Sequence, residues 1–199
     1  GLKMKRFIQQ VLLFSGIVTV LIGSIFFITK KYIAVHTDYK IPENIDKIII
    51  GHSQPECAYN DSLINNFKNF SSSGESYFYS YYKLIPLLNN NKNIKTVFVE
   101  FTNNQIEEII NEWIWGDKFL PFKYKLYGSL INSEGQNILL SKNLTGFINS
   151  QFHYLKHNLK IISSNNYSFS SYSGGFLPVY SNKVDDAIDR QNANMVTAE

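Results

Sequence analysis

The residue best suited to chemistry is Ser53, which follows three isoleucines, a glycine and a histidine at positions 48–52. A β-branched run that stops at a glycine predicts a buried strand that ends in a turn. Ligands of open α/β sheets bind at the carboxyl ends of the strands, so we expect the Ser53 hydroxyl in a reactive position. A serine becomes a good nucleophile only when a base takes its proton. The pattern therefore predicts a serine nucleophile that needs a base.

Two of the four histidines lie in the first part of the chain, at His36 and His52. His36 is close to a long apolar segment, and we expect it at a membrane interface. His52 is adjacent to Ser53, but neighbouring side chains on an extended turn usually point apart. We therefore favour a base elsewhere and keep His52 as an alternative.

The other two histidines, His153 and His157, are four residues apart, on one face of a predicted helix. This spacing suits either a metal pair or a solvated basic face. Because Lys156 and Lys160 lie beside them and no carboxylate accompanies them, we favour the basic face. No metal site and no cofactor is predicted.

Three carboxylates, Glu56, Asp61 and Glu75, crowd the loops near Ser53. Helix caps and first turns, where the helix dipole favours negative charge, explain them better than acid–base roles do. The single cysteine, Cys57, is expected as a small buried side chain. One cysteine excludes an internal disulfide and a Cys-based zinc site.

Residues 7–29 contain no charged side chain. As a helix rising about 1.5 Å per residue they cover roughly 30 Å, the thickness of a bilayer core. A cleavable signal peptide is the alternative, but its apolar region is shorter and ends in a small-x-small site that this segment lacks. We therefore predict an uncleaved transmembrane anchor. The basic residues before it favour an amino end in the cytoplasm, with the rest of the chain in the periplasm or outside the cell.

A juxtamembrane connector at 30–45 and an α/β domain at 46–199 are predicted to follow the anchor. Three strands are expected, at 47–50, 67–70 and 96–101, the last covered on both faces. Helices are expected at 61–64, 75–88, 105–113, 150–162 and 184–192, with residues 118–172 as a mainly helical insertion. Strand, helix and strand in this order predict a right-handed crossover and a doubly wound parallel sheet. Such a sheet normally has about five strands, so we expect this one to be incomplete. Either it lacks its carboxyl-terminal part, or something else completes the sheet.

Composition narrows the function further. The net charge is only +3 and no long basic run is present, so nucleic-acid binding is not predicted. Aromatic residues make up 15% of the chain, which favours a packed globule over disorder. The aromatic residues of 113–124 lie among lysines and suit either a membrane-interface patch or ordinary core packing.

Short segments after the three predicted strands resemble the sequence blocks of SGNH (GDSL-type) hydrolases. Residues 51–53 are similar to the Gly-Asp-Ser turn that follows the first strand of that family. Ser73 and Gly74 resemble the second block, whose glycine amide helps to form the oxyanion hole. Residues 101–104 lie where the third block carries Gly-x-Asn-Asp. The order and spacing fit over residues 46–105, about a third of the chain.

The resemblance implies a flavodoxin-like sheet and a serine esterase or O-acyltransferase. Ser53 is then the nucleophile, and its own amide, the Gly74 amide and the side chain of Asn103 or Asn104 stabilise the oxyanion. Membrane-tethered members act in cell-surface acyl transfer, which implies an envelope glycan or another surface polymer as substrate. The implied location is the inner (cytoplasmic) membrane. The implied partners are the lipid bilayer and a membrane acyltransferase or other envelope complex subunits. Residues 51–82 and 112–117 also resemble uncharacterised envelope proteins of Bacteroidetes.

The chain departs from the family at three points. His52 replaces the aspartate of the first block, and Thr102 replaces the glycine of the third. The family's final Asp-x-x-His, which supplies the base and its acid, has no counterpart after Asp185, Asp186 or Asp189. Two functions remain open: an enzyme whose base lies beyond Glu199, or an inactive SGNH-like scaffold or accessory subunit of an envelope complex.

Overall fold

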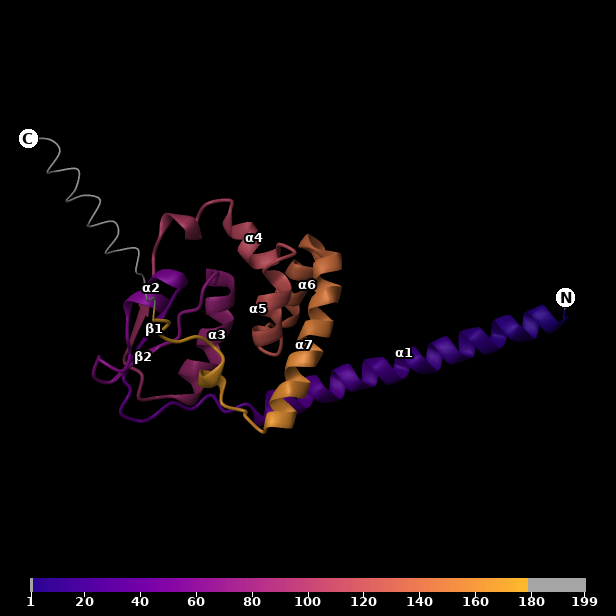
Figure 1. Cartoon of the computed structure of the whole chain (residues 1–199), viewed down its shortest axis with the longest axis horizontal. Helices are drawn as coiled ribbons and strands as arrows, with labels where there is room; N and C mark the ends of the chain where they lie inside the picture. Colours follow the sequence, from indigo (N-terminus) through magenta and orange to yellow (C-terminus); the bar gives the residue numbers. More distant parts are fainter. Residues whose placement is uncertain (1, 179–199) are drawn as a thin grey trace, which may run out of the picture.

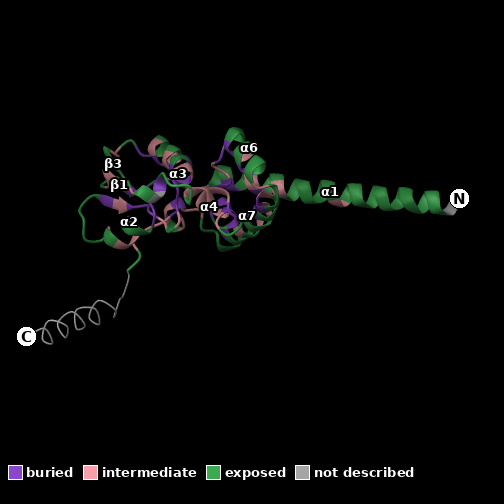
Figure 2. Ribbon diagram, turned by 90° about the horizontal axis from the view of Figure 1, so that it is seen from above, coloured by how far each residue is buried: buried purple, intermediate pink, exposed green. Residues whose placement is uncertain are grey.

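The computed structural model describes residues 2–178, in which one long helix projects from a mixed α/β globular part (Figure 1). This helix, α1 (Leu2–His36), is long and apolar enough to cross a membrane. Figure 2 shows it exposed along most of its length, whereas Thr29 and Ile33 near its end are buried. The predicted helix at 7–29 is confirmed, and it continues into the first residues of the predicted connector.

Three short strands form a parallel sheet: β1 (Lys47–Ile50), β2 (Phe67–Asn69) and β3 (Thr96–Val99). The strand order is β2-β1-β3, and Ile48 of β1 is paired with Lys68 on one side and Val97 on the other. The three predicted strands and their parallel arrangement are confirmed. Because all three run in the same direction, the segments that follow them emerge at one edge of the sheet.

One face of the sheet packs on α3 (Tyr77–Asn90), the crossover helix between β2 and β3. Ile48 and Ile50 of β1 share a buried apolar cluster with Tyr79 and Leu87 of this helix. Burial of these side chains gives the sheet and the crossover a common core.

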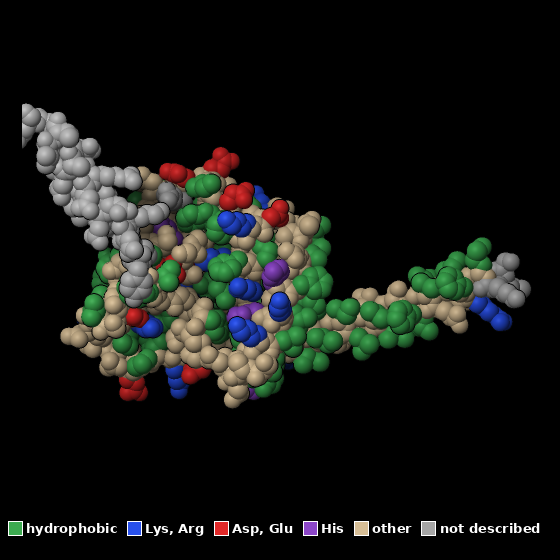
Figure 3. Space-filling model, in the orientation of Figure 1, with side chains coloured by type: hydrophobic (Ala, Val, Ile, Leu, Met, Phe, Trp, Pro, Cys, Tyr) green, Lys and Arg blue, Asp and Glu red, His purple; other side chains and the backbone are tan. Residues whose placement is uncertain are grey.

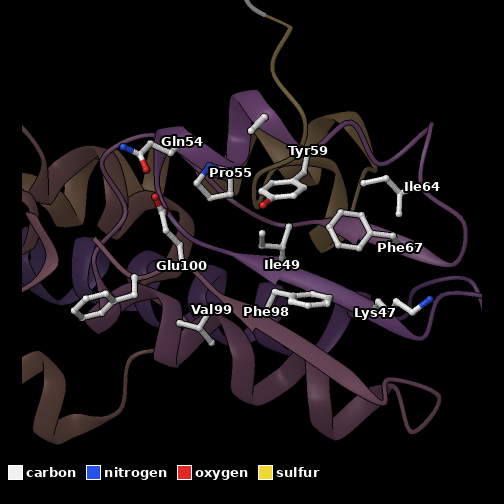
Figure 4. A pocket seen from close by; sticks show the side chains of 12 residues that line it. Lys47, Ile49, Gln54, Pro55, Tyr59, Ile64, Phe67, Phe98, Val99 and Glu100 are labelled. Carbon is white, nitrogen blue, oxygen red and sulfur yellow. The ribbon is translucent and has the colours of Figure 1, made fainter. Parts of the chain in front are cut away.

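The opposite face of the sheet is only partly covered, which corrects the prediction that the third strand is buried on both faces. Phe98 and Val99 of β3 are exposed. Across from Phe98 lie α2 (Ser53–Ala58) and the loop after it, and between them is an apolar hollow of about 610 Å³ (Figure 4). The apolar composition of β3 is compatible with burial on both faces. In the described sheet, however, β3 is an edge strand, and little packs against its second face.

The remaining helices form a second part beside the sheet. They are α4 (Ile110–Trp115), α5 (Leu120–Tyr127), α6 (Ser133–Lys142) and α7 (Leu144–Ser164). Helices α5 and α7 lie side by side and pack together extensively (Figure 1). Tyr124, Tyr127, Leu139 and Tyr154 carry the same core into this part. Residues 118–172 are therefore mainly helical, as expected, and α7 includes the predicted helix at 150–162.

Two predicted helices differ from the structure. Residues 61–64 form turns, and Asp61 pairs there with Lys68 at 2.7 Å. The segment predicted as a helix at 105–113 contains the end of a 3₁₀ turn, η1 (Asn103–Gln105), and the first residues of α4. A second 3₁₀ turn, η2 (Phe169–Ser171), follows α7. The helix predicted at 184–192 lies outside the described residues.

The stability of the helical part is expected to depend on His157, whose ring lies edge-on to Tyr172 with the centroids 5.5 Å apart. Burial, assisted by the charges of Lys125 and Lys160, lowers the pKa of His157 to about 4. The unfolded chain binds a proton near pH 6.5 and the folded chain does so only near pH 4. The free energy of unfolding is therefore at its full value above about pH 6.5. It decreases as the pH falls from 6.5 towards 4, because the unfolded chain binds the proton more readily.

Thermal unfolding in detergent between pH 7.5 and pH 4.5 tests this expectation. The variant His157→Phe keeps an aromatic ring against Tyr172 and removes the titrating group, so its midpoint should fall less on acidification than that of the unaltered chain. His153→Phe, at an exposed position of the same helix, is the control and should behave like the unaltered chain. Equal acid sensitivity of all three proteins would show that His157 is not responsible.

Candidate functional site

Ser53 is the first residue of α2 and lies, exposed, beyond the carboxyl end of β1. His52 is the N-cap of this helix, with φ −94° and ψ −143°, so the backbone turns between the two residues. The Ser53 Oγ lies 3.4 Å from the His52 Nδ1, which also accepts from the Gln54 N–H at 3.4 Å. We expected the two side chains to point apart. They approach each other because Ser53 begins a helix and does not continue an extended turn.

Glu100, directly after β3, holds His52 at two points. Its Oε2 accepts the backbone N–H of His52 at 2.6 Å, and its Oε1 lies 3.1 Å from the ring Nε2. The hydroxyl of Thr102 is 3.0 Å from the same Nε2. The His52 and Glu100 side chains are almost fully buried. Because Nδ1 accepts the Gln54 N–H, the ring proton is assigned to Nε2, beside the Thr102 hydroxyl and the Glu100 carboxylate, and the lone pair of Nδ1 lies on the side of Ser53.

The result is the order of groups that nucleophilic catalysis needs: a hydroxyl, an imidazole acceptor and a carboxylate that orients the imidazole. The 3.4 Å separation of Ser53 from His52 is longer than a good hydrogen bond, but such contacts are commonly loose without substrate. The arrangement can therefore take a proton from Ser53 and hold it on His52 beside Glu100.

Gly51 explains how the carboxylate comes so close to the end of β1. A Cβ at this position would lie 2.6 Å from the Cβ of Glu100 and 2.7 Å from the Cγ of Pro55. Real Cβ atoms do not make such contacts, so any larger residue here displaces Glu100 or α2. The glycine of the sequence motif thus makes room for the carboxylate.

The predicted oxyanion residue Gly74 lies in the loop after β2 with φ +65°, a conformation that favours glycine. A Cβ there would lie 2.7 Å from the ring of Phe119. The carbonyl of Ser73 accepts a hydrogen bond from the Nζ of Lys123 at 2.7 Å. This carbonyl and the Gly74 N–H belong to one peptide unit, so the ammonium group polarises the unit and strengthens its N–H as a donor.

Lys123 belongs to a buried charge cluster beneath this loop, which also contains Glu75, Lys83 and Tyr127. The side chains of Glu75 and both lysines have no exposed surface. Glu75 Oε1 lies 2.6 Å from the Nζ of Lys83, and Oε2 lies 3.9 Å from that of Lys123. The hydroxyl of Tyr127 donates to Oε2 at 2.7 Å. The Glu75 carboxylate is therefore the shared partner of two buried ammonium groups and the Tyr127 hydroxyl.

Burial is the largest cause of the pKa shifts of the two lysines and the tyrosine. It lowers the pKa of Lys83, and it lowers the pKa of Lys123 to about 8 although Glu75 opposes the change. It also raises the pKa of Tyr127 well above its usual value. Lys83 additionally donates to the carbonyl of Phe70 at 2.5 Å. The two lysines thus bind carbonyls on both sides of the loop that follows β2 and fix its path.

The other predicted oxyanion residues follow β3. Asn103 lies exposed on η1, while the side chain of Asn104 lies outside the described part of the structure. Within residues 2–178, no hydrogen bond joins Ser53 to Gly74 or to Asn103. The strands therefore bring the three predicted segments to one edge of the sheet, without direct bonds among these residues.

The aromatic residues of 113–124 mostly pack inside the protein, as one of the two alternatives predicts. Tyr124 is buried in the core. Trp113 lies edge-on to His52, with the ring centroids 5.6 Å apart, and also contacts Phe119. Phe122 remains exposed. Trp113 and Phe119 therefore lie beside His52 and Gly74, and Tyr124 packs in the core of the helical part.

The two histidines of α7 lie in different environments in the structure. His153 is exposed together with Lys156 and Lys160, as expected for a solvated basic face, but His157 is half-buried against Tyr172. Across the described residues, no group of three histidine, cysteine or acidic side chains is placed to hold a metal ion.

Glu100 and Thr102 are site residues that the sequence patterns did not predict. The available signal is positional: Glu100 is a single carboxylate directly after an apolar strand, at the same sheet edge as Ser53. The hollow of about 610 Å³ reaches this residue, with Gln54 and Glu100 at one end and Lys47 at the other (Figure 4).

Comparisons of the chain with protein-family models, with curated proteins and with solved structures found no match.

Proposed function

We propose that this protein is a membrane-anchored serine esterase or O-acyltransferase with an SGNH-like sheet. Its proposed substrate is an acyl ester of an envelope glycan or another surface polymer. The observation that carries the proposal is the chain of contacts from the Ser53 Oγ through the His52 ring to the Glu100 carboxylate. The strand order β2-β1-β3 supports it, because flavodoxin-like sheets begin with the same order.

In the proposed reaction, the Nδ1 of His52 takes the Ser53 proton as the Oγ attacks the ester carbonyl carbon. Glu100 stabilises the imidazolium that forms at His52. The N–H groups of Ser53 and Gly74 donate to the oxyanion. The departing alcohol then takes the proton from Nδ1, which leaves an acyl group on Ser53. Water completes hydrolysis, and a polymer hydroxyl completes transfer.

The proposed location follows from α1, which is long and apolar enough to anchor the protein in the cytoplasmic membrane. The globular part then lies on the periplasmic or extracellular side, where envelope polymers are found. Proposed partners are the lipid bilayer and a membrane acyltransferase or other subunits of an envelope complex.

The second candidate is a non-catalytic SGNH-like subunit of such a complex. The observation that favours it is the double use of the His52 Nδ1, which caps α2 by accepting the Gln54 N–H. In this function the histidine is a helix cap held by Glu100, and Ser53 is an ordinary first-turn residue.

Covalent labelling with a fluorophosphonate separates the two candidates. The full-length chain in lipid nanodiscs is expected to gain one adduct on Ser53, located by peptide mass spectrometry, and Ser53→Ala should gain none. Ser62→Ala, which changes an exposed serine outside the site, should be labelled like the unaltered protein. A folded protein that takes up no label at Ser53 would exclude the nucleophile and favour the non-catalytic subunit.

A further inference from the structure

Helix α7 has an unusual distribution of side chains over its three faces. The face toward the protein is mainly small or polar and includes Gly146, Ser150, Tyr154 and Asn158. A second face is apolar and exposed: Leu144 is 59% exposed, Ile148 52%, Phe152 58% and Leu159 49%. The spacing of these four residues places them along one side of the helix. A helix of a water-soluble globule normally buries such a stripe.

The third face of α7 is polar and basic. His153, Lys156 and Lys160 are exposed there, together with Asn149. An exposed apolar stripe flanked by basic side chains is the pattern of a helix that lies in the headgroup region of a membrane. The lysines then contact anionic headgroups while the apolar stripe enters the acyl chains.

Helix α1 shows where this membrane surface lies. Phe26 of α1 contacts Phe152 of the exposed stripe, with ring centroids 5.8 Å apart in an edge-to-face arrangement. The uncharged stretch 7–25 before this contact covers about 28 Å at 1.5 Å per residue, close to the thickness of a bilayer core. Helix α1 therefore leaves the globular part beside the apolar stripe of α7.

The figures show the same geometry. Helix α7 crosses the side of the globular part from which α1 projects (Figure 1). Hydrophobic side chains gather along that edge, and lysine and histidine side chains lie beside them (Figure 3). When α1 spans the bilayer, this edge faces the bilayer surface.

We infer that α7 lies on the membrane that α1 crosses, with Leu144, Ile148, Phe152 and Leu159 inserted among lipid acyl chains. Its contact with α1 then fixes the globular part against the bilayer at one orientation and does not leave it free on a tether. This inference rests on the proposed anchoring by α1 but not on the proposed chemistry at Ser53.

Site-directed spin labelling of the full-length chain tests the inference. In a Cys57→Ser background, single cysteines replace Ile148 and Leu159 on the stripe, Asn149 on the polar face, and Ile17 within α1. The labelled proteins are placed in nanodiscs of phosphatidylethanolamine and phosphatidylglycerol. Collision rates of each nitroxide with oxygen, which concentrates in lipid, and with a water-soluble nickel chelate are then compared.

Labels at positions 148 and 159 should have an oxygen-to-nickel collision ratio several-fold higher than the label at the matched position 149. An aqueous ratio at 148 and 159, with a lipid ratio at 17, overturns the α7 inference and leaves the anchor intact. An aqueous ratio at 17 refutes the anchor itself. Labels at 148 and 159 that are immobilised and shielded from both reagents show that protein covers the stripe, which also overturns the inference.

Discussion

Replacing Glu100 with glutamine is expected to slow the reaction of Ser53 with a fluorophosphonate by about 10⁴-fold while the chain stays folded. The glutamine amide still accepts the backbone N–H of His52, which Glu100 accepts at 2.6 Å. Its NH₂ group then faces the ring Nε2 and donates to it. This moves the ring proton to Nδ1, so the nitrogen beside Ser53 can no longer accept a proton.

The second-order labelling rate constant, measured between pH 6 and pH 9, is the readout for Glu100→Gln. The thermal unfolding midpoint, recorded on the same samples, shows that the variant is folded. Glu107→Gln is the matched control, because it makes the same change at an exposed position just after η1. Labelling of Glu100→Gln at the unaltered rate would show that Glu100 only anchors the helix cap, which is its role in the non-catalytic alternative.

Replacing Glu75 with alanine is expected to lower the free energy of unfolding by about 3–5 kcal/mol. Lys83 and Lys123 would then be left without their carboxylate, and both amines are completely buried. Two buried amines without a carboxylate cost far more than the loss of one exposed ion pair, which is worth about 0–1 kcal/mol. The loss is a large fraction of the stability of an ordinary domain, about 5–15 kcal/mol.

Denaturant unfolding of Glu75→Ala in detergent, compared with the unaltered chain, measures this cost. The control Glu108→Ala removes an exposed carboxylate and should change the free energy of unfolding by less than about 0.5 kcal/mol. Adding Lys83→Met to Glu75→Ala removes one of the uncompensated amines and should restore part of the stability. If the double variant is no more stable than Glu75→Ala, unpaired buried charge is not the cause.

The parts of the fold that depend on local pattern were predictable from sequence. The β-branched runs at β1 and β3 and the long uncharged stretch of α1 are strong signals, and each element forms where it is expected. Helix α2 was not predicted, although Pro55 and Glu56 follow Ser53 closely and suit a first helical turn. A helix of only six residues has too few positions to show a helical periodicity in the sequence.

The features that depend on tertiary contacts were not predictable. Lys83 and Lys123 lie on helices, where a lysine usually faces water, and only the meeting of α3 and α5 around Glu75 buries both. The contact between His52 and Glu100 joins residues 48 positions apart. The predicted Ser53 and Gly74 both reach the sheet edge, but the exposure of Phe98 could not be inferred, because apolar composition does not reveal what lies against a strand.

The hydrogen bond from Lys123 to the carbonyl of Ser73 also has a consequence for the order of events during folding. The strands, the turn at Ser53 and the loop at Gly74 all lie within residues 47–99, but the ammonium group that polarises the loop arrives on α5. A nascent chain can thus pair its strands before Lys123 reaches the carbonyl of Ser73. If Ser53 is the proposed nucleophile, its full reactivity is expected only after α5 has packed against this loop.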